Sequence, residues 1–182
     1  GRIDFKEMQI SDEDLNKYEQ IYIVACGSAW HVGMAAQYVL EDLADIPVRV
    51  ELASEFRYRK MSLKSNALVI VISQSGETAD TLAALRLAKE KGLTTMAIVN
   101  VVGSSIAREA DKVFYTLAGP EISVATTKAY SAQLAAMYLL SMKFAKVRGM
   151  LTDEEFAQLR SDLIQLPDQI ESLFGMKEKI QK

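Results

Sequence analysis

The chain has 182 residues, 49% of them hydrophobic, and a formal net charge of −3. This length and composition predict one globular domain with a sizeable core, and the acidic balance argues against nucleic acids or anionic membranes as partners. The single cysteine, Cys26, excludes an internal disulfide. We recognise neither a signal-peptide pattern nor an apolar run long enough to span a bilayer, so we expect a cytoplasmic location. Because the chain opens with glycine, we also expect it to be a piece of a longer protein.

Apolar runs alternate with amphipathic stretches along most of the chain, and unbroken apolar runs are typical of strands buried on both faces of a sheet. The predicted strands are Ile21–Cys26, Pro47–Leu52, Ala67–Ile72, Thr94–Val99 and Lys112–Tyr115. The predicted helices are Ala29–Leu43, Thr78–Lys91, Ser104–Ala110 and Val124–Arg148, with Gly92 and Gly149 ending the second and the fourth. This alternation predicts an α/β fold with a five-stranded parallel sheet and helices on both faces, in the flavodoxin-like strand order 2-1-3-4-5.

The two ends of the chain differ from this alternating part. Residues 1–20 are charged and contain no strand pattern, so we expect an N-terminal linker before a domain at residues 21–150. Residues 151–182 begin with a capping box, Thr152 and Glu155, and carry an apolar stripe without a further strand. We expect a helical inter-domain linker there, which Pro167 ends or kinks, with a further helix beginning at Asp168.

The junction after the third predicted strand is the strongest indication of function. The run Ala67–Ile72 stops at Ser73-Gln74-Ser75-Gly76, and a helical pattern begins near Thr78. The first N–H groups of a helix have no intrahelical partner and carry partial positive charge, which makes this end a site for anions. The three hydroxyls can donate hydrogen bonds, and glycine lets the backbone approach a ligand closely. We predict a phosphate site, with simple helix capping by Ser75 or Thr78 as the alternative.

The predicted topology places a second polar turn beside this one. In the order 2-1-3-4-5, ligands bind where strands 1 and 3 diverge, at their carboxyl ends. Strand 1 ends at Cys26-Gly27-Ser28 and strand 3 at Ser73-Gln74-Ser75. We therefore expect Gly27, Ser28 and the Ser73–Thr78 turn to form one site.

Three motifs carry a family resemblance: C-G-S-A-W, S-Q-S-G-E-T-A-D-T and V-A-T-T-K-A-Y. In this order and spacing they resemble a sugar isomerase (SIS) domain over about residues 21–148. The segments A-S-E-F-R-Y-R-K and A-G-P-E-I-S-V-A-T-T-K narrow the resemblance to the glucosamine-6-phosphate synthases, the glutamine–fructose-6-phosphate aminotransferases. S-Q-S-G-E-T alone is shared by many SIS proteins, whereas the combination is more restrictive.

The resemblance implies a role for several residues. It assigns Ser73, Gln74, Ser75 and Thr78 to the phosphate of the substrate, and Gly76 lies within the same turn. It assigns Ser28, next to Gly27, to a contact with the sugar, and Val124 and Thr126 to contacts with the substrate. Ala29 stands where the family has serine, so that only a backbone contact remains, and Ser123 replaces a usual glycine.

The same resemblance implies that this chain holds half of a site. In the family, fructose 6-phosphate and glutamine become glucosamine 6-phosphate and glutamate, without a metal or organic cofactor. The glutaminase is a separate domain, and the carboxylate, lysine and histidine of the sugar chemistry belong to a second SIS domain. The expected partners are therefore these two domains and the hexose phosphate, and we expect the isolated chain to bind substrate but to be inactive.

Two other functions remain open from the residues alone. A sugar-phosphate sensor would use the same S-Q-S-G-E-T turn without catalysis. A single-domain phosphosugar isomerase would need its own base, and the candidates are Glu55, Glu77 and His31. His31 is more simply a structural residue, Lys128 is either an anion contact or a surface lysine, and Cys26 is expected to be a small core residue.

The predicted helix after Val124 bears on assembly. It is apolar almost all round, with Lys128 and Lys143 as its charges up to Ala145. Such a helix is buried on more than one side. We expect a homodimer in which this helix or the segment Glu55–Arg59 is covered by the neighbour, with a central core helix as the alternative.

Overall fold

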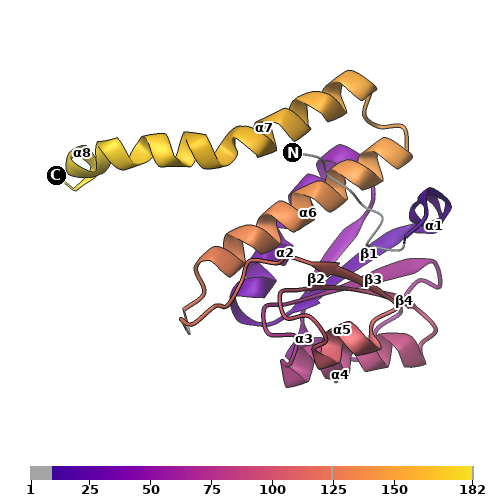
Figure 1. Ribbon diagram of the computed structural model, residues 1–182. Coiled ribbons are helices and arrows are strands. Elements are labelled where there is room, and N and C mark those ends of the chain that lie inside the picture. The colour runs from indigo at the N-terminus through magenta and orange to yellow at the C-terminus, as the bar shows by residue number, and fades with distance from the viewer. Residues whose placement is uncertain (1–9, 124, 182) are drawn as a thin grey trace.

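The computed structural model describes residues 10–123 and 125–181 (Figure 1). Five strands form the sheet: β1 (Gln20–Ala25), β2 (Val48–Leu52), β3 (Ala67–Ser73), β4 (Thr94–Val99) and β5 (Lys112–Tyr115). The helices are α1 (Asp12–Lys17), α2 (Gly27–Ala44), α3 (Ala53–Phe56), α4 (Ala79–Glu90), α5 (Ser105–Glu109), α6 (Lys128–Val147), α7 (Asp153–Ser172) and α8 (Lys177–Ile180), with a 3-10 turn η2 (Leu173–Met176) before α8.

All neighbouring strands pair in parallel, in the order β2-β1-β3-β4-β5. Ile23 of β1, for example, lies between Val50 of β2 and Ile70 of β3. The expected α/β class, strand number and strand order are confirmed. The carboxyl ends of β1 and β3 are therefore adjacent, with their connecting helices leaving in opposite directions along the sheet.

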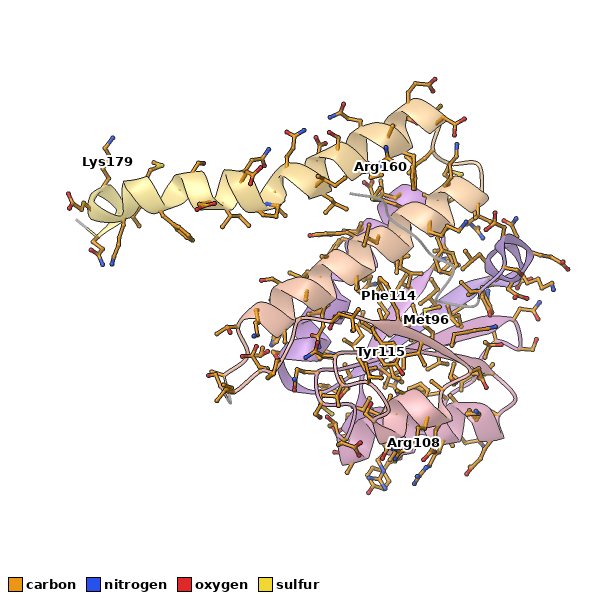
Figure 2. All side chains as sticks on the ribbon, in the orientation of Figure 1. Met96, Arg108, Phe114, Tyr115, Arg160 and Lys179 are labelled. Atoms are coloured by element: carbon orange, nitrogen blue, oxygen red, sulfur yellow. The ribbon has the colours of Figure 1, made fainter. Side chains whose placement is uncertain are left out.

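Successive side chains of each central strand point to opposite faces of the sheet and so belong to two separate cores. Ile21 and Ile23 of β1, with Leu68, Ile70 and Ile72 of β3, pack toward α2 and α6. Tyr22 and Val24 of β1, with Val69 and Val71 of β3, pack toward α3, α4 and α5. Both sets are apolar, which is why the strands read as unbroken apolar runs. Figure 2 shows Met96 and Phe114 on the α6 side of the sheet and Arg108 on the opposite side.

Several boundaries differ from those predicted. Helix α6 begins at Lys128 rather than at Val124, which itself lies outside the described residues. The helix α1 at Asp12–Lys17 was not predicted; Ser11 and Asp14 form its capping box, and Leu15 anchors it in the core. The two predicted glycine ends are confirmed, since Gly92 and Gly149 have φ values of +75° and +73° directly after α4 and α6.

The helix does not end at Pro167 and no new helix begins at Asp168, because α7 runs through both residues to Ser172. Proline removes one N–H and leaves the carbonyl four residues earlier without its intrahelical partner. No residue of α7 is buried, so water reaches that carbonyl, and the helix continues. The capping box of Thr152 and Glu155 is confirmed: Glu155 N–H donates to Thr152 Oγ1 at 3.1 Å and Thr152 N–H to Glu155 Oε2 at 2.9 Å.

The apolar surface left exposed is not where the sequence indicated. Helix α6 is covered by α2 on one side and by the start of α7 on another, and Leu140, Phe144 and Ala145 are fully buried. The end of α7, with η2 and α8, extends away from the domain (Figure 1). The large exposed apolar side chains of this extension are Ile164, Leu166, Ile170, Leu173, Phe174, Met176 and Ile180. Helix α6 thus behaves mainly as a core helix of its own domain.

Candidate functional site

A cavity of about 350 Å³ lies at the adjacent carboxyl ends of β1 and β3. Three segments form its wall: the β1–α2 turn, the β3–α4 turn, and the approach to α6 with the first turns of that helix. Its lining residues are Cys26, Gly27, Ser28, Ala29, Ile72, Ser73, Gln74, Ser75, Thr78, Glu121, Ser123, Thr126 and Gln133. The two hydroxyl-bearing turns therefore meet, as the predicted topology requires.

Most of the predicted site residues line this cavity. They are Gly27, Ser28, Ser73, Gln74, Ser75, Thr78 and Thr126. Gly76 lies in the same turn but does not contribute to the wall, and Val124 falls outside the described residues. Ala29 and Ser123, the two departures from the family pattern, both line the cavity.

Hydrogen bonds within the β3–α4 turn fix its shape. Ser73 Oγ accepts the N–H of Gly76 at 3.0 Å and lies 3.1 Å from Thr78 Oγ1. Ser75 Oγ accepts the N–H of Glu77 at 3.2 Å. Ser73 is buried, whereas Ser75 and Thr78 are half-buried at the cavity. The turn thus holds its hydroxyls in place before any ligand arrives.

Two long helices present uncapped N-termini to the cavity. Thr78 is the N-cap of α4 and Cys26 that of α2, and neither side chain hydrogen-bonds the first turn of its helix. The Thr78 hydroxyl bonds to Ser73 instead. The alternative of simple capping therefore does not describe what these hydroxyls do. The free N–H groups and the dipoles of both helices favour an anion at this place.

Glycine is required at position 76 because Ser104 packs closely against the β3–α4 turn. Its φ is +68°, and a Cβ there would lie 2.0 Å from Ser104 Oγ and 2.5 Å from Ser104 Cβ. The Gly76 carbonyl accepts the N–H of Ile106 at 3.0 Å, which ties the turn to α5. The close approach predicted for Gly76 is thus made to the β4–α5 connection.

Helix α6 differs from α2 and α4 because its N-terminus is already occupied by a carboxylate. Glu121 Oε2 accepts the N–H of Thr127 at 3.1 Å and that of Ala129 at 3.2 Å. The Thr127 N–H, followed by that of Ala129, holds the pKa of Glu121 below its usual value. This contact fixes the segment between Pro120 and Lys128, which carries Ser123 and Thr126 to the cavity.

An ion pair links the E-F-R-Y-R segment to the same region. Arg57 Nη1 lies 2.7 Å from Asp80 Oδ1 in the first turn of α4. The guanidinium therefore compensates the negative charge that Asp80 places near the free N–H groups of α4.

The three candidate bases lie outside the cavity. His31 is exposed, with its ring 5.0 Å from the Trp30 ring. Glu77 accepts the N–H of Ser105 at 2.7 Å, a contact that lowers the pKa of Glu77, and Glu55 is an exposed residue of the short helix α3. None of the three belongs to the described cavity wall.

Lys128 and Cys26, which the sequence left without a definite role, lie at different distances from the cavity wall. Lys128 is the exposed first residue of α6 and does not line the cavity. Cys26 is half-buried and does line it, which corrects the expectation of a pure core residue. Cys26 directly follows β1 and is the N-cap of α2, which places its side chain at the cavity.

Sequence reasoning missed two wall residues, Glu121 and Gln133. Neither has a local pattern that marks it: Glu121 caps a helix from seven residues before that helix begins, and Gln133 lies within an otherwise apolar helix. Both reach the cavity because α6 packs across α2.

A wider hollow of about 600 Å³ adjoins the cavity and shares Gln74 and Glu121 with it. Its remaining lining residues are Asn100, Val101, Leu117, Gly119 and Pro120. The Asn100 amide is engaged there, donating to the Gly119 carbonyl at 2.7 Å and accepting the Ala118 N–H at 2.7 Å. The smaller cavity, which holds the free helix N-termini, is therefore the better anion site.

Two features are absent from residues 10–123 and 125–181. No group of three or more histidine, cysteine, aspartate or glutamate side chains could hold a metal ion. No helix in these ranges is both long and apolar enough to cross a membrane.

Comparisons with known proteins agree with the sequence motifs. The chain is 52% identical over 180 residues to a glutamine–fructose-6-phosphate aminotransferase of Clostridium acetobutylicum, and 53% identical over 182 residues to that of Caldanaerobacter subterraneus. These alignments cover 99% and 100% of the chain but only 30% of either relative, so the chain spans less than a third of their length.

A solved structure is similar over most of the fold. The C-terminal domain of glucosamine-fructose-6-phosphate aminotransferase from Francisella tularensis matches with a TM-score of 0.89 and 40% identity, covering 93% of this chain and 48% of that one. The SIS domain model matches residues 14–143, which include all five strands and most of α6. The chain is therefore homologous to part of these aminotransferases and belongs to the SIS domain family.

Proposed function

We propose that the cavity binds a hexose phosphate, fructose 6-phosphate, and that the chain is the first of two SIS halves of a glutamine–fructose-6-phosphate aminotransferase. The observation that carries the proposal is the convergence of two uncapped helix N-termini and three hydroxyls on one cavity. The similarity to aminotransferases along the whole chain supports the choice of sugar phosphate.

The phosphate fits the α4 end of the cavity for physical reasons. Ser75 and Thr78 hydroxyls and the free N–H groups of α4 offer donors to a dianion, and Ser28 at the start of α2 faces the same space. The protein carries a net charge of −3, so attraction must come from these local groups rather than from a basic surface.

In this proposal the chain holds the substrate and other parts of a longer protein transform it. Glu55, Glu77 and His31 are not part of the described cavity wall, which counts against a complete single-domain isomerase. The missing acid and base groups come from the second SIS domain, and ammonia comes from the glutaminase domain. The assembly is a cytoplasmic homodimer, and sedimentation of the chain at micromolar concentration tests the pairing: a monomer would contradict it.

The binding part is tested by titration calorimetry with fructose 6-phosphate. Each neutral hydroxyl contributes about 0.5–1.5 kcal/mol, so Ser75→Ala should weaken binding several-fold and the Ser73→Ala, Thr78→Val double variant more. Ser65→Ala is the matched control, because Ser65 is exposed in the turn before β3 and away from the cavity. Unchanged affinity in the double variant would refute the assignment.

The half-site part is tested by activity. The purified chain should form no glucosamine 6-phosphate and should not isomerise hexose phosphates. Turnover that is abolished by His31→Ala or Glu77→Gln would replace the proposal with a complete isomerase.

A further inference from the structure

Gln133 is a buried polar residue in the wall of the cavity. It lies in the second turn of α6 and is only 2% exposed. Among the described residues it has no hydrogen-bond partner, although Gln20, another buried glutamine, donates to the Pro47 carbonyl at 2.9 Å. The amide atoms of Gln133 are not among the fully buried polar atoms without a partner, so the amide opens on the cavity that the residue lines. An amide that faces a cavity and makes no hydrogen bond to the described residues is free to bind a ligand group.

A second unpaired polar atom lies in the same wall. Thr126 Oγ1 is buried and has no partner within the described part of the chain. Thr126 and Gln133 both come from the α6 side of the cavity, whereas the free helix N-termini belong to α2 and α4. The cavity thus has an anion-binding side at α2 and α4 and, on the α6 side, the neutral polar groups of Thr126 and Gln133 beside the Glu121 carboxylate, which accepts the N–H groups of Thr127 and Ala129.

The size of the cavity leaves room for more than a phosphate. Its volume of about 350 Å³ is within the range of small-molecule sites, whereas a water molecule occupies only about 30 Å³. A primary amide both donates and accepts hydrogen bonds, which matches a hydroxyl group or a carbonyl with a neighbouring hydroxyl. A carboxylate or phosphate would use only the donor side of the amide.

From this arrangement we propose that Gln133 is a specificity-determining residue that binds an oxygen of the sugar portion, while the β3–α4 turn binds the phosphate. The inference rests on the proposed function and assigns the second half of the same cavity. In this inference, the α4 end of the cavity provides the affinity for phosphate. The α6 side provides the preference for a phosphate that is attached to a polyhydroxylated sugar.

The experiment compares inorganic phosphate and fructose 6-phosphate by titration calorimetry on the whole chain. Gln133→Met keeps the length of the side chain and removes the amide. It should weaken fructose 6-phosphate binding about three- to tenfold and leave phosphate binding unchanged. Because the amide makes no hydrogen bond to the described residues, the melting temperature should change little, whereas a structural role would lower it.

Ser141→Ala is the matched control, because Ser141 is a buried polar residue of the same helix that donates to the Met137 carbonyl and lies outside the cavity wall. It should change neither affinity. Equal losses for both ligands in Gln133→Met, or no loss for either, would overturn the inference while phosphate binding itself stands.

Gln133→Glu adds a second measurement that keeps the polar packing: its negative charge should weaken fructose 6-phosphate binding further. If the unaltered chain binds neither ligand, the proposed function itself is contradicted, whatever the variants show.

Discussion

Single residues decide which helix N-terminus is free to take an anion. Glu121 fills the N-terminus of α6, whereas Thr78 turns its hydroxyl to Ser73 and leaves α4 open. Arg57 neutralises Asp80 beside that opening. In the proposed function, the phosphate therefore binds at the open ends of α4 and α2 rather than at α6, whose N-terminus is occupied by a carboxylate of the chain itself.

Gly76→Ala tests how the β3–α4 turn packs against Ser104. At positive φ any L-residue costs about 1–2 kcal/mol, and at this position its Cβ would also collide with Ser104. Gly103→Ala is the matched control, since Gly103 has a φ of +73° with nothing within 4 Å of a Cβ. Urea unfolding should show a larger loss of stability for Gly76→Ala; equal losses would contradict the contact.

Glu121 makes stability depend on pH in the acid range. Its pKa is lowered in the folded state, so the carboxylate stabilises the fold above its usual pKa and this contribution is lost as the pH falls through the lowered value. Between about pH 5 and pH 3 the unaltered chain should lose more stability than Glu121→Gln. Glu90→Gln, an exposed carboxylate at the end of α4, is the control. Parallel stability curves for Glu121→Gln and the unaltered chain would show that the cap is not formed.

At the scale of elements, the sequence predicted the sheet better than its surroundings. The three central strands, β1, β3 and β4, are buried on both faces, so their apolar runs give their positions within a residue or two. Helix α1 and the run of α7 through Pro167 were missed, because one depends on a single anchor, Leu15, and the other on exposure to water. In the site, both turns were predicted from local pattern, whereas Glu121 and Gln133 reach it only through the packing of α6.

The junction between α2 and the end of α6 offers a test of that packing. The Arg148 guanidinium donates to the carbonyls of Ala44 at 2.8 Å and Asp45 at 3.3 Å, where α2 ends. Arg148→Met should destabilise the fold by about 1.5–3 kcal/mol in urea unfolding, because these carbonyls lose charged donors. Arg160→Met, an exposed arginine of α7 labelled in Figure 2, should change stability little. A similar loss in both variants would contradict a specific role for Arg148.

At the scale of the whole molecule, the structure combines a closed domain with an open extension. The domain buries its two cores around the sheet, while η2 and α8 carry exposed apolar side chains such as Phe174, which is 71% exposed (Figure 1). Several large exposed apolar side chains on one segment are typical of an interface. This agrees with a chain that spans less than a third of the relatives that it matches.

The location of the phosphate is best tested by a crystal structure of the chain with fructose 6-phosphate. We expect the phosphate at the start of α4, with its oxygens about 3 Å from the Ser75 and Thr78 hydroxyls, and the sugar directed toward Gln133. A phosphate in the adjoining hollow beside Asn100 and Leu117, or a sugar phosphate bound anywhere away from the β1 and β3 ends, would contradict it.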